Sequence, residues 1–142
     1  MARFKIGLCW FFALFFFFAG IMHFVEVDSF AAIVPPMLPF PKLIVWVTGV
    51  MEIAFALGLL LPKYRKLSGF WLAPFLLAVL PANIYMAMYN VPMGDTVASS
   101  TALWVRVALQ FPLIALILWA SGNIGTGTYT SCARRHYKGE GP

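Results

Sequence analysis

Hydrophobic residues fall into four long runs along this chain, separated by short polar or proline-rich segments. Each run has about twenty residues, and a helix of that length, rising about 1.5 Å per residue, crosses the hydrocarbon core of a bilayer. The pattern therefore predicts an all-α fold, an integral membrane four-helix bundle in which residues 1–142 form a single domain. The predicted spans are residues 6–24, 42–61, 67–89 and 101–120.

The segments that join the runs differ in composition. Residues 25–41 are largely apolar, and four prolines within them remove backbone donors, so we expect no regular helix there. Two further prolines, Pro74 and Pro81, lie inside the third run, where each should kink the helix. Residues 121–142 are rich in Gly, Ser and Thr and then basic, which indicates an exposed tail.

Composition agrees with a membrane location, and charge sets an orientation. The chain is 62% hydrophobic and 11% charged, whereas soluble domains have about 25% charged residues. In a four-span arrangement nearly all Lys and Arg fall on one side, so the positive-inside rule predicts an up-down-up-down topology with both termini cytoplasmic. That side has Arg3, Lys5, Lys63, Arg65, Lys66, Arg134, Arg135 and Lys138, and the other has Glu26, Asp28, Asp95 and the single base Lys42.

Each predicted span contributes one strongly polar side chain to the outer half of the bundle: His23, Glu52, Asn83 and Arg106. Glu52 lies deepest, about 15 Å below the outer end of its span, where a carboxylate costs roughly 2.5–3.5 kcal/mol unless it is protonated or partnered. Polar residues at such depths normally face the bundle interior and pair there. We therefore predict a polar pocket in the outer half of the bundle, with an ion pair between Glu52 and Arg106 as the preferred contact.

Small or weakly polar residues accompany these four positions at helical spacing. Thr48 and Gly49 precede Glu52 by one turn, Asn90 follows Asn83 by two turns, and Gln110 follows Arg106 by one turn. Small side chains allow helices to approach closely, and amides can bond across the interface. These four residues are the predicted supporting positions of the pocket.

Each polar residue also has a purely structural explanation. Glu52 could be protonated or could belong to an ion pair that fixes helix register. His23 fits an interfacial histidine, and Arg106 is near enough to the outer surface to extend its side chain toward water. Asn83 could join two helices for about 0.6 kcal/mol. The convergence of all four on one leaflet supports a functional pocket as well as it supports a structural network.

Several chemistries are disfavoured by what the sequence contains. Cys9 and Cys132 have neither CxxC nor zinc-ligand spacing, and a dithiol relay lacks a second thiol near Cys9. The candidate ligands His23, Glu26 and Asp28 are too few for a predicted metal site. Haem held by two histidines is excluded, because His136 falls on the opposite side. The net charge of +5 is explained by topology, and no phosphate loop, hydrolase triad or nucleic-acid motif is present.

Three stretches resemble the DoxX family of small four-helix bacterial membrane proteins, in its DoxX-like branch: AGIMHF, IVPPMLPFPKLIVWVTGVMEIAFALGLLLPKYRKLSG and LPANIYMAMYN. The similarity covers roughly residues 15–110. It implies a four-helix fold, a multi-pass location in the bacterial cytoplasmic (inner) membrane, and an association with quinone-linked or oxidative-stress redox complexes. The positions that match the family pattern are His23, Pro35, Pro36, Gly49, Glu52, Pro81, Asn83 and Arg106.

Three functional hypotheses follow for a protein embedded in the lipid bilayer. The first is a redox- or quinone-associated accessory subunit whose outer-leaflet pocket binds a quinone, the one cofactor that the resemblance suggests. The second is a non-catalytic assembly or structural subunit of a larger membrane redox complex. The third is a conduit for a small solute or protons, which requires a homo-oligomer because four helices leave little room for a pore. Enzyme activity by the chain alone is the least supported class, and no catalytic residue is assigned.

Overall fold

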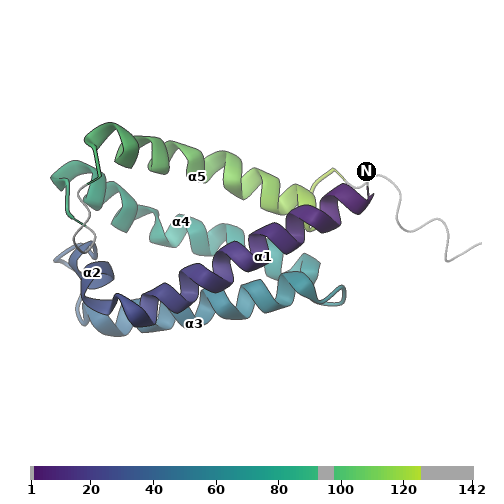
Figure 1. The fold of residues 1–142 in the computed structure, drawn as a ribbon, viewed down its shortest axis with the longest axis horizontal. Coiled ribbons are helices and arrows are strands. Elements are labelled where there is room, and N and C mark those ends of the chain that lie inside the picture. The colour runs from purple at the N-terminus through teal and green to yellow at the C-terminus, as the bar shows by residue number, and fades with distance from the viewer. Residues whose placement is uncertain (1, 93–97, 126–142) are drawn as a thin grey trace, which may run out of the picture.

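A computed structural model describes residues 2–92 and 98–125 of the chain. Within these residues the fold is all-helical and contains no strand (Figure 1). A short helix, α2, follows the first of four long helices. The helices are α1 (Ala2–Val25), α2 (Val27–Ala32), α3 (Pro41–Leu60), α4 (Arg65–Tyr89) and α5 (Ser100–Ala120).

The four long helices coincide with the four predicted spans. Each is long and apolar enough to cross a membrane, and each begins and ends within about four residues of the predicted bounds. Large apolar side chains are exposed along all of them, including Phe11, Trp46, Leu77 and Leu109. An outer surface of this kind suits contact with lipid chains. The all-α prediction and the number of long apolar helices are therefore confirmed.

The prediction that residues 25–41 contain no regular helix is wrong, because α2 forms within them. Its six residues include no proline, and the first proline, Pro35, comes three residues after α2 ends. Proline restricts itself and the residue before it, so it ends a helix there without preventing one upstream. An ion pair at 2.7 Å between exposed Asp28 and Lys42 connects α2 to the first turn of α3.

The ends of α3 follow from local chemistry. Pro41 occupies the first helical position, where its missing N–H costs no hydrogen bond. Phe40 before it adopts a left-handed conformation, with φ of 57° and ψ of 56°. At the other end, the Arg65 guanidinium donates to the carbonyl oxygens of Leu59 and Leu60 at 3.0 and 3.4 Å. These bonds satisfy carbonyls that the end of a helix leaves without partners.

Proline does not break the helices that contain it. α4 continues through Pro74 and Pro81, and α5 continues through Pro112. A proline inside a helix removes one hydrogen bond, and neighbouring groups can satisfy the carbonyl that it leaves free.

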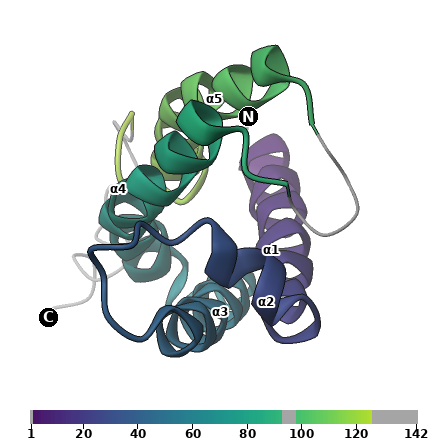
Figure 2. The same cartoon turned by 90° about the vertical axis from the view of Figure 1, so that its left-hand side faces the viewer.

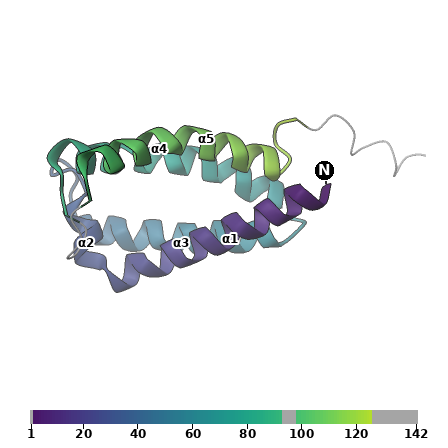
Figure 3. The same ribbon diagram turned by 45° about the horizontal axis from the view of Figure 1, so that its top comes forward.

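The long helices lie side by side as two pairs, α1 with α3 and α4 with α5 (Figure 1, Figure 2). The pairs converge where α1 begins and α5 ends, and they diverge toward α2 (Figure 3). We call the end of the bundle where the pairs converge the closed end, and the opposite end the α2 end. At the closed end, Phe4 packs edge-on against Trp119, and the Lys5 ammonium lies 4.5 Å from the centre of the same ring.

Two apolar clusters hold the bundle together. The larger joins all four long helices: Phe12, Ala13, Phe16, Ala56, Leu59, Leu72, Phe75, Leu76 and Ile117. The smaller connects the residue after α2 to α4 and α5 at the α2 end: Ile33, Met86, Ala87, Leu103 and Val107. The larger cluster therefore packs the two helix pairs against each other from the middle of the bundle toward the closed end. At the α2 end, the smaller cluster packs Ile33 against α4 and α5.

Candidate functional site: a polar cluster in an apolar cavity

A cavity of about 1340 Å³ lies between the two helix pairs. All four long helices contribute to its lining, and residues of the 30–38 segment contribute at the α2 end. The lining is mostly aliphatic and aromatic. The four polar residues predicted from the sequence all line this one cavity: His23, Glu52, Asn83 and Arg106.

Close contact between α1 and α3 brings His23 and Glu52 together. A Cβ atom on Gly20 would lie 2.8 Å from the carbonyl oxygen of Gly49, and a Cβ on Gly49 would lie 2.8 Å from the Cβ of His23. Only glycine therefore allows the two backbones to approach this closely. Glu52 lies one turn along α3 from Gly49, so its carboxylate meets the His23 ring. Gly49 thus lies where α1 and α3 approach most closely to the His23 side chain.

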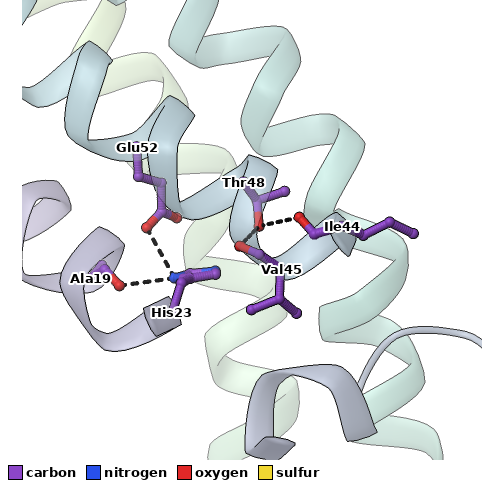
Figure 4. Close-up of polar contacts among 6 residues, drawn as sticks. All are labelled: Ala19, His23, Ile44, Val45, Thr48 and Glu52. Atoms are coloured by element: carbon purple, nitrogen blue, oxygen red, sulfur yellow. Dashed lines mark hydrogen bonds and ion pairs between the residues drawn. The ribbon is translucent and has the colours of Figure 1, made fainter. Parts of the chain in front are cut away.

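The His23–Glu52 contact leaves one carboxylate oxygen incompletely satisfied (Figure 4). His23 Nδ1 lies 2.8 Å from the Ala19 carbonyl oxygen and 3.5 Å from Glu52 Oε2. A carbonyl only accepts hydrogen bonds, so Nδ1 carries a proton and donates it. Glu52 Oε2 is buried and has no hydrogen-bond partner. A buried acceptor of this kind is costly, and such groups are concentrated at functional sites.

α2 fixes the orientation of the His23 ring. The Phe30 ring stacks on it, with 4.1 Å between the ring centres and an angle of 26° between the planes. Phe30, Ile33 and Leu38 also line the cavity, so α2 and the residues after it cover the polar end. The apolar composition of residues 25–41 and the position of Phe30 predict that this segment either packs against the membrane interface or folds over the mouth of the bundle. The contact of Phe30 with His23 agrees with the second arrangement.

Asn83 and Gln110 connect α4 to α5. The Asn83 Nδ2 donates to Gln110 Oε1 at 3.0 Å, and Gln110 Nε2 donates to the carbonyl oxygen of Leu76. That carbonyl lies five residues before Pro81, in the part of α4 where the proline ring weakens the helical bonding. Gln110 is buried and bonded at both ends of its amide, so it has a larger role than the supporting position predicted for it.

Arg106 does not pair with Glu52 as predicted. In the part of the chain that the structure describes, its guanidinium forms no ion pair or hydrogen bond. The physical reason is helix order: α3 and α5 belong to different pairs and lie on opposite sides of the cavity (Figure 2). Both side chains nevertheless line the same cavity. The cavity thus has a carboxylate–imidazole pair on one wall and an unpaired guanidinium on the other.

Two other supporting positions have roles that differ from the prediction. The Thr48 hydroxyl lines the cavity but donates to carbonyl oxygens of its own helix, Ile44 and Val45, both at 3.0 Å. Asn90 lies outside the cavity, at the end of α4, in a left-handed conformation with φ of 48°. Asn tolerates this conformation better than most residues, so its presence there reflects helix termination. The prediction that Asn90 supports the pocket is wrong.

The metal-ligating and thiol residues form no further site in residues 2–92 and 98–125. No group of three or more His, Cys, Asp or Glu side chains there could hold a metal ion. Cys9 is buried among apolar side chains and is unpaired. Asp95, Cys132 and His136 lie outside the described residues, as does most of the predicted 121–142 tail.

Fold and site define a class of protein: an all-helical bundle with four helices apolar enough to cross a membrane, enclosing an apolar cavity with a polar cluster at one end. The chain belongs to the family described as "Domain of unknown function (DUF8561)", whose model matches residues 12–121. That range contains the four residues of the polar cluster, His23, Glu52, Asn83 and Arg106. No curated protein and no solved structure matches the chain.

Proposed function

We propose that this chain is a multi-pass protein of the bacterial cytoplasmic membrane, with an up-down-up-down topology and both termini in the cytoplasm. The charge distribution over the described residues supports this orientation. The closed end has Arg3 and Lys5 at the start of α1 and Lys63 and Lys66 near the start of α4. The α2 end has Glu26 and, in its ion pair with Lys42, Asp28. Basic residues favour the cytoplasmic side, so the α2 end and the polar cluster would face outward.

Within that membrane, we propose that the cavity binds the ring of a lipid-soluble quinone. The supporting observation is the Glu52–His23 pair, whose buried Oε2 has no hydrogen-bond partner, opposite the Arg106 guanidinium in a largely apolar cavity. Ligand sites commonly combine an apolar lining with a few convergent polar groups. The resemblance to the DoxX family points to the same class of ligand, and it stays a prediction.

The chemistry of these groups suits a molecule with two carbonyl oxygens. The Arg106 guanidinium has five N–H donors and can donate to one ring oxygen. Glu52 and His23 can supply or accept a proton at the other, because both groups exist in two protonation states. The protein would thereby bind and orient the quinone. The electrons would come from a redox partner in the same membrane, so the chain acts as an accessory protein and is not an enzyme on its own.

Quinone binding to the purified protein in detergent tests this proposal. A quinone analogue should bind saturably, and Glu52→Gln and Arg106→Ala should each weaken binding by at least about tenfold, since one interaction with a charged group is worth roughly 1.5–3 kcal/mol. Glu26→Gln and Arg3→Ala are matched controls: both side chains are exposed, and neither lines the cavity. Absence of saturable binding, or equal loss in the controls, would contradict the proposal.

A structural subunit of a membrane complex is the second candidate. It is favoured by the Asn83–Gln110–Leu76 network, whose two hydrogen bonds join α4 to α5 and need no ligand. The two functions differ in their expectation for Glu52→Gln. Because Glu52 Oε2 has no hydrogen-bond partner, a ligand-binding role predicts an unchanged or higher melting temperature in detergent together with lost binding. A structural role predicts a lower melting temperature and unchanged copurification partners.

A further inference from the structure

Polarity is distributed unevenly along the cavity. All the charged and amide side chains of its lining lie between the α2 end and the middle of the long helices: His23, Glu52, Asn83, Arg106 and Gln110. Toward the closed end the lining is aliphatic and aromatic, and it includes Phe15, Phe75, Leu113, Leu116 and Trp71. A compact polar molecule would use only the first part of this space. The second part is suited to a hydrocarbon.

The apolar part is long. Along α4, Trp71 lies twelve residues before Asn83, and along α5, Leu116 lies six residues after Gln110. At about 1.5 Å of rise per residue, these separations correspond to roughly 18 Å and 9 Å. The apolar part therefore extends over about a third to a half of the ~30 Å hydrocarbon thickness of a bilayer. It runs parallel to the helices, which is also the direction of lipid chains if the helices cross the membrane.

The cavity is accessible from its flank. Several lining side chains are more than half exposed, so the cavity is open along the helices: Phe15 of α1 at 52% exposure, Leu109 of α5 at 59% and Trp71 of α4 at 54%. The polar end, in contrast, lies beneath α2 and Phe30. A ligand would therefore reach the site sideways from the hydrocarbon region. This route suits a molecule that is itself dissolved in the membrane.

From these three observations we propose that the cavity binds a quinone together with its isoprenoid tail. The ring contacts Glu52 and Arg106, and the tail lies along α4 and α5 toward Trp71 and Leu116. This inference rests on the proposed quinone function and adds a second recognition element to it. Tail length as well as ring chemistry then determines which quinones bind.

A series of analogues with one ring and increasing tail length tests the tail site. The probes are a quinone without a tail, one with a short isoprenoid tail, and one whose tail exceeds the apolar part of the cavity. Affinity should rise by about tenfold from the first probe to a tail that fills the cavity. It should then level off, because additional units contact only detergent. An affinity that is independent of the tail, or that rises steadily with every added unit as partitioning into micelles does, would overturn the proposal.

A variant in the apolar part separates the tail site from the ring site. Ala78 lines the cavity on α4, about one and a half turns from Asn83 toward Trp71. Ala78→Trp should fill this space and reduce the affinity for the tailed probe to that of the tailless one, while leaving the tailless affinity unchanged. Ala54→Trp is the matched control, because Ala54 is exposed on α3 and does not line the cavity.

The outcomes distinguish the two proposals. If tailless and tailed probes bind equally to wild type and to Ala78→Trp, and Glu52→Gln still weakens binding by at least about tenfold, the tail site is wrong and the ring site stands. If no probe binds saturably, the quinone function itself fails. Native mass spectrometry of the purified protein adds an independent result. A retained diacyl phospholipid that Ala78→Trp releases would show that a lipid chain, and no isoprenoid tail, occupies this part of the cavity.

Discussion

The closed end and the α2 end of the bundle are built from the same four helices, but they differ in packing. At the closed end, Phe12, Leu72 and Ile117 meet in a buried cluster that joins both helix pairs. At the α2 end, each pair keeps its own contact and the space between pairs stays open as the cavity (Figure 3). Large apolar residues close one end, whereas polar residues on four helices and the α2 segment border the other. The closed end is thus expected to determine stability, and the α2 end to determine binding.

Deleting core volume at the closed end should have the largest effect on stability. Leu72 is fully buried, and Leu72→Ala should lower the free energy of unfolding by roughly 2 kcal/mol through lost packing. Leu109→Ala is the comparison, because Leu109 is 59% exposed and borders the cavity. It should change stability by less than about 0.5 kcal/mol. Thermal unfolding in detergent measures both, and equal losses would remove the distinction between the two ends.

Separating α1 from α3 tests how the His23–Glu52 pair is positioned. Gly49→Ala places a methyl group 2.8 Å from the His23 Cβ and should cost about 1–2 kcal/mol while weakening quinone binding. Gly7→Ala provides the control, since a Cβ there has nothing within 4 Å and alanine has the higher helix propensity. If Gly49→Ala preserved both melting temperature and binding, the close contact would not be needed to form the site.

Removing the amide bridge between α4 and α5 should have a smaller effect. Gln110→Leu leaves Asn83 and the Leu76 carbonyl without their partner, at a cost of about 1 kcal/mol. Asn83→Leu in the same background should add little, because both changes disrupt one network. A double-mutant cycle on unfolding free energies checks this. Fully additive losses would show that the two amides act independently.

The ion pair between α2 and α3 should matter least for stability. Asp28 and Lys42 are both largely exposed, so Asp28→Asn should change the unfolding free energy by less than about 0.5 kcal/mol. Quinone binding at low ionic strength is the second measurement, because α2 covers the polar end of the cavity. A loss of stability above 1 kcal/mol would mean that the α2 segment contributes more to the fold than its exposure indicates.

Much of the candidate site could be predicted from the sequence, because a polar side chain within an apolar span normally faces the interior of the bundle. One such residue on each helix predicted an interior cluster, and His23, Glu52, Asn83 and Arg106 do line one cavity. The pairing among them could not be predicted, because helical spacing shows which face a residue occupies but not which helix lies opposite. The Glu52–Arg106 prediction was wrong for that reason, and Glu52 meets His23 instead.

By itself the sequence determined the long helices of this protein and the polar residues within them: the length of the apolar runs, and the one strongly polar side chain that each span contributes to the outer half of the bundle. These are local properties, since hydrophobicity and proline geometry act within a few residues. Tertiary structure decided the rest. The approach of Gly20 to Gly49, the bridge formed by Gln110, and the placement of α2 over His23 each depend on residues distant in the chain. The cavity itself exists because the two helix pairs converge at one end only. That arrangement depends on contacts among all four long helices, so it could not be predicted from any one segment.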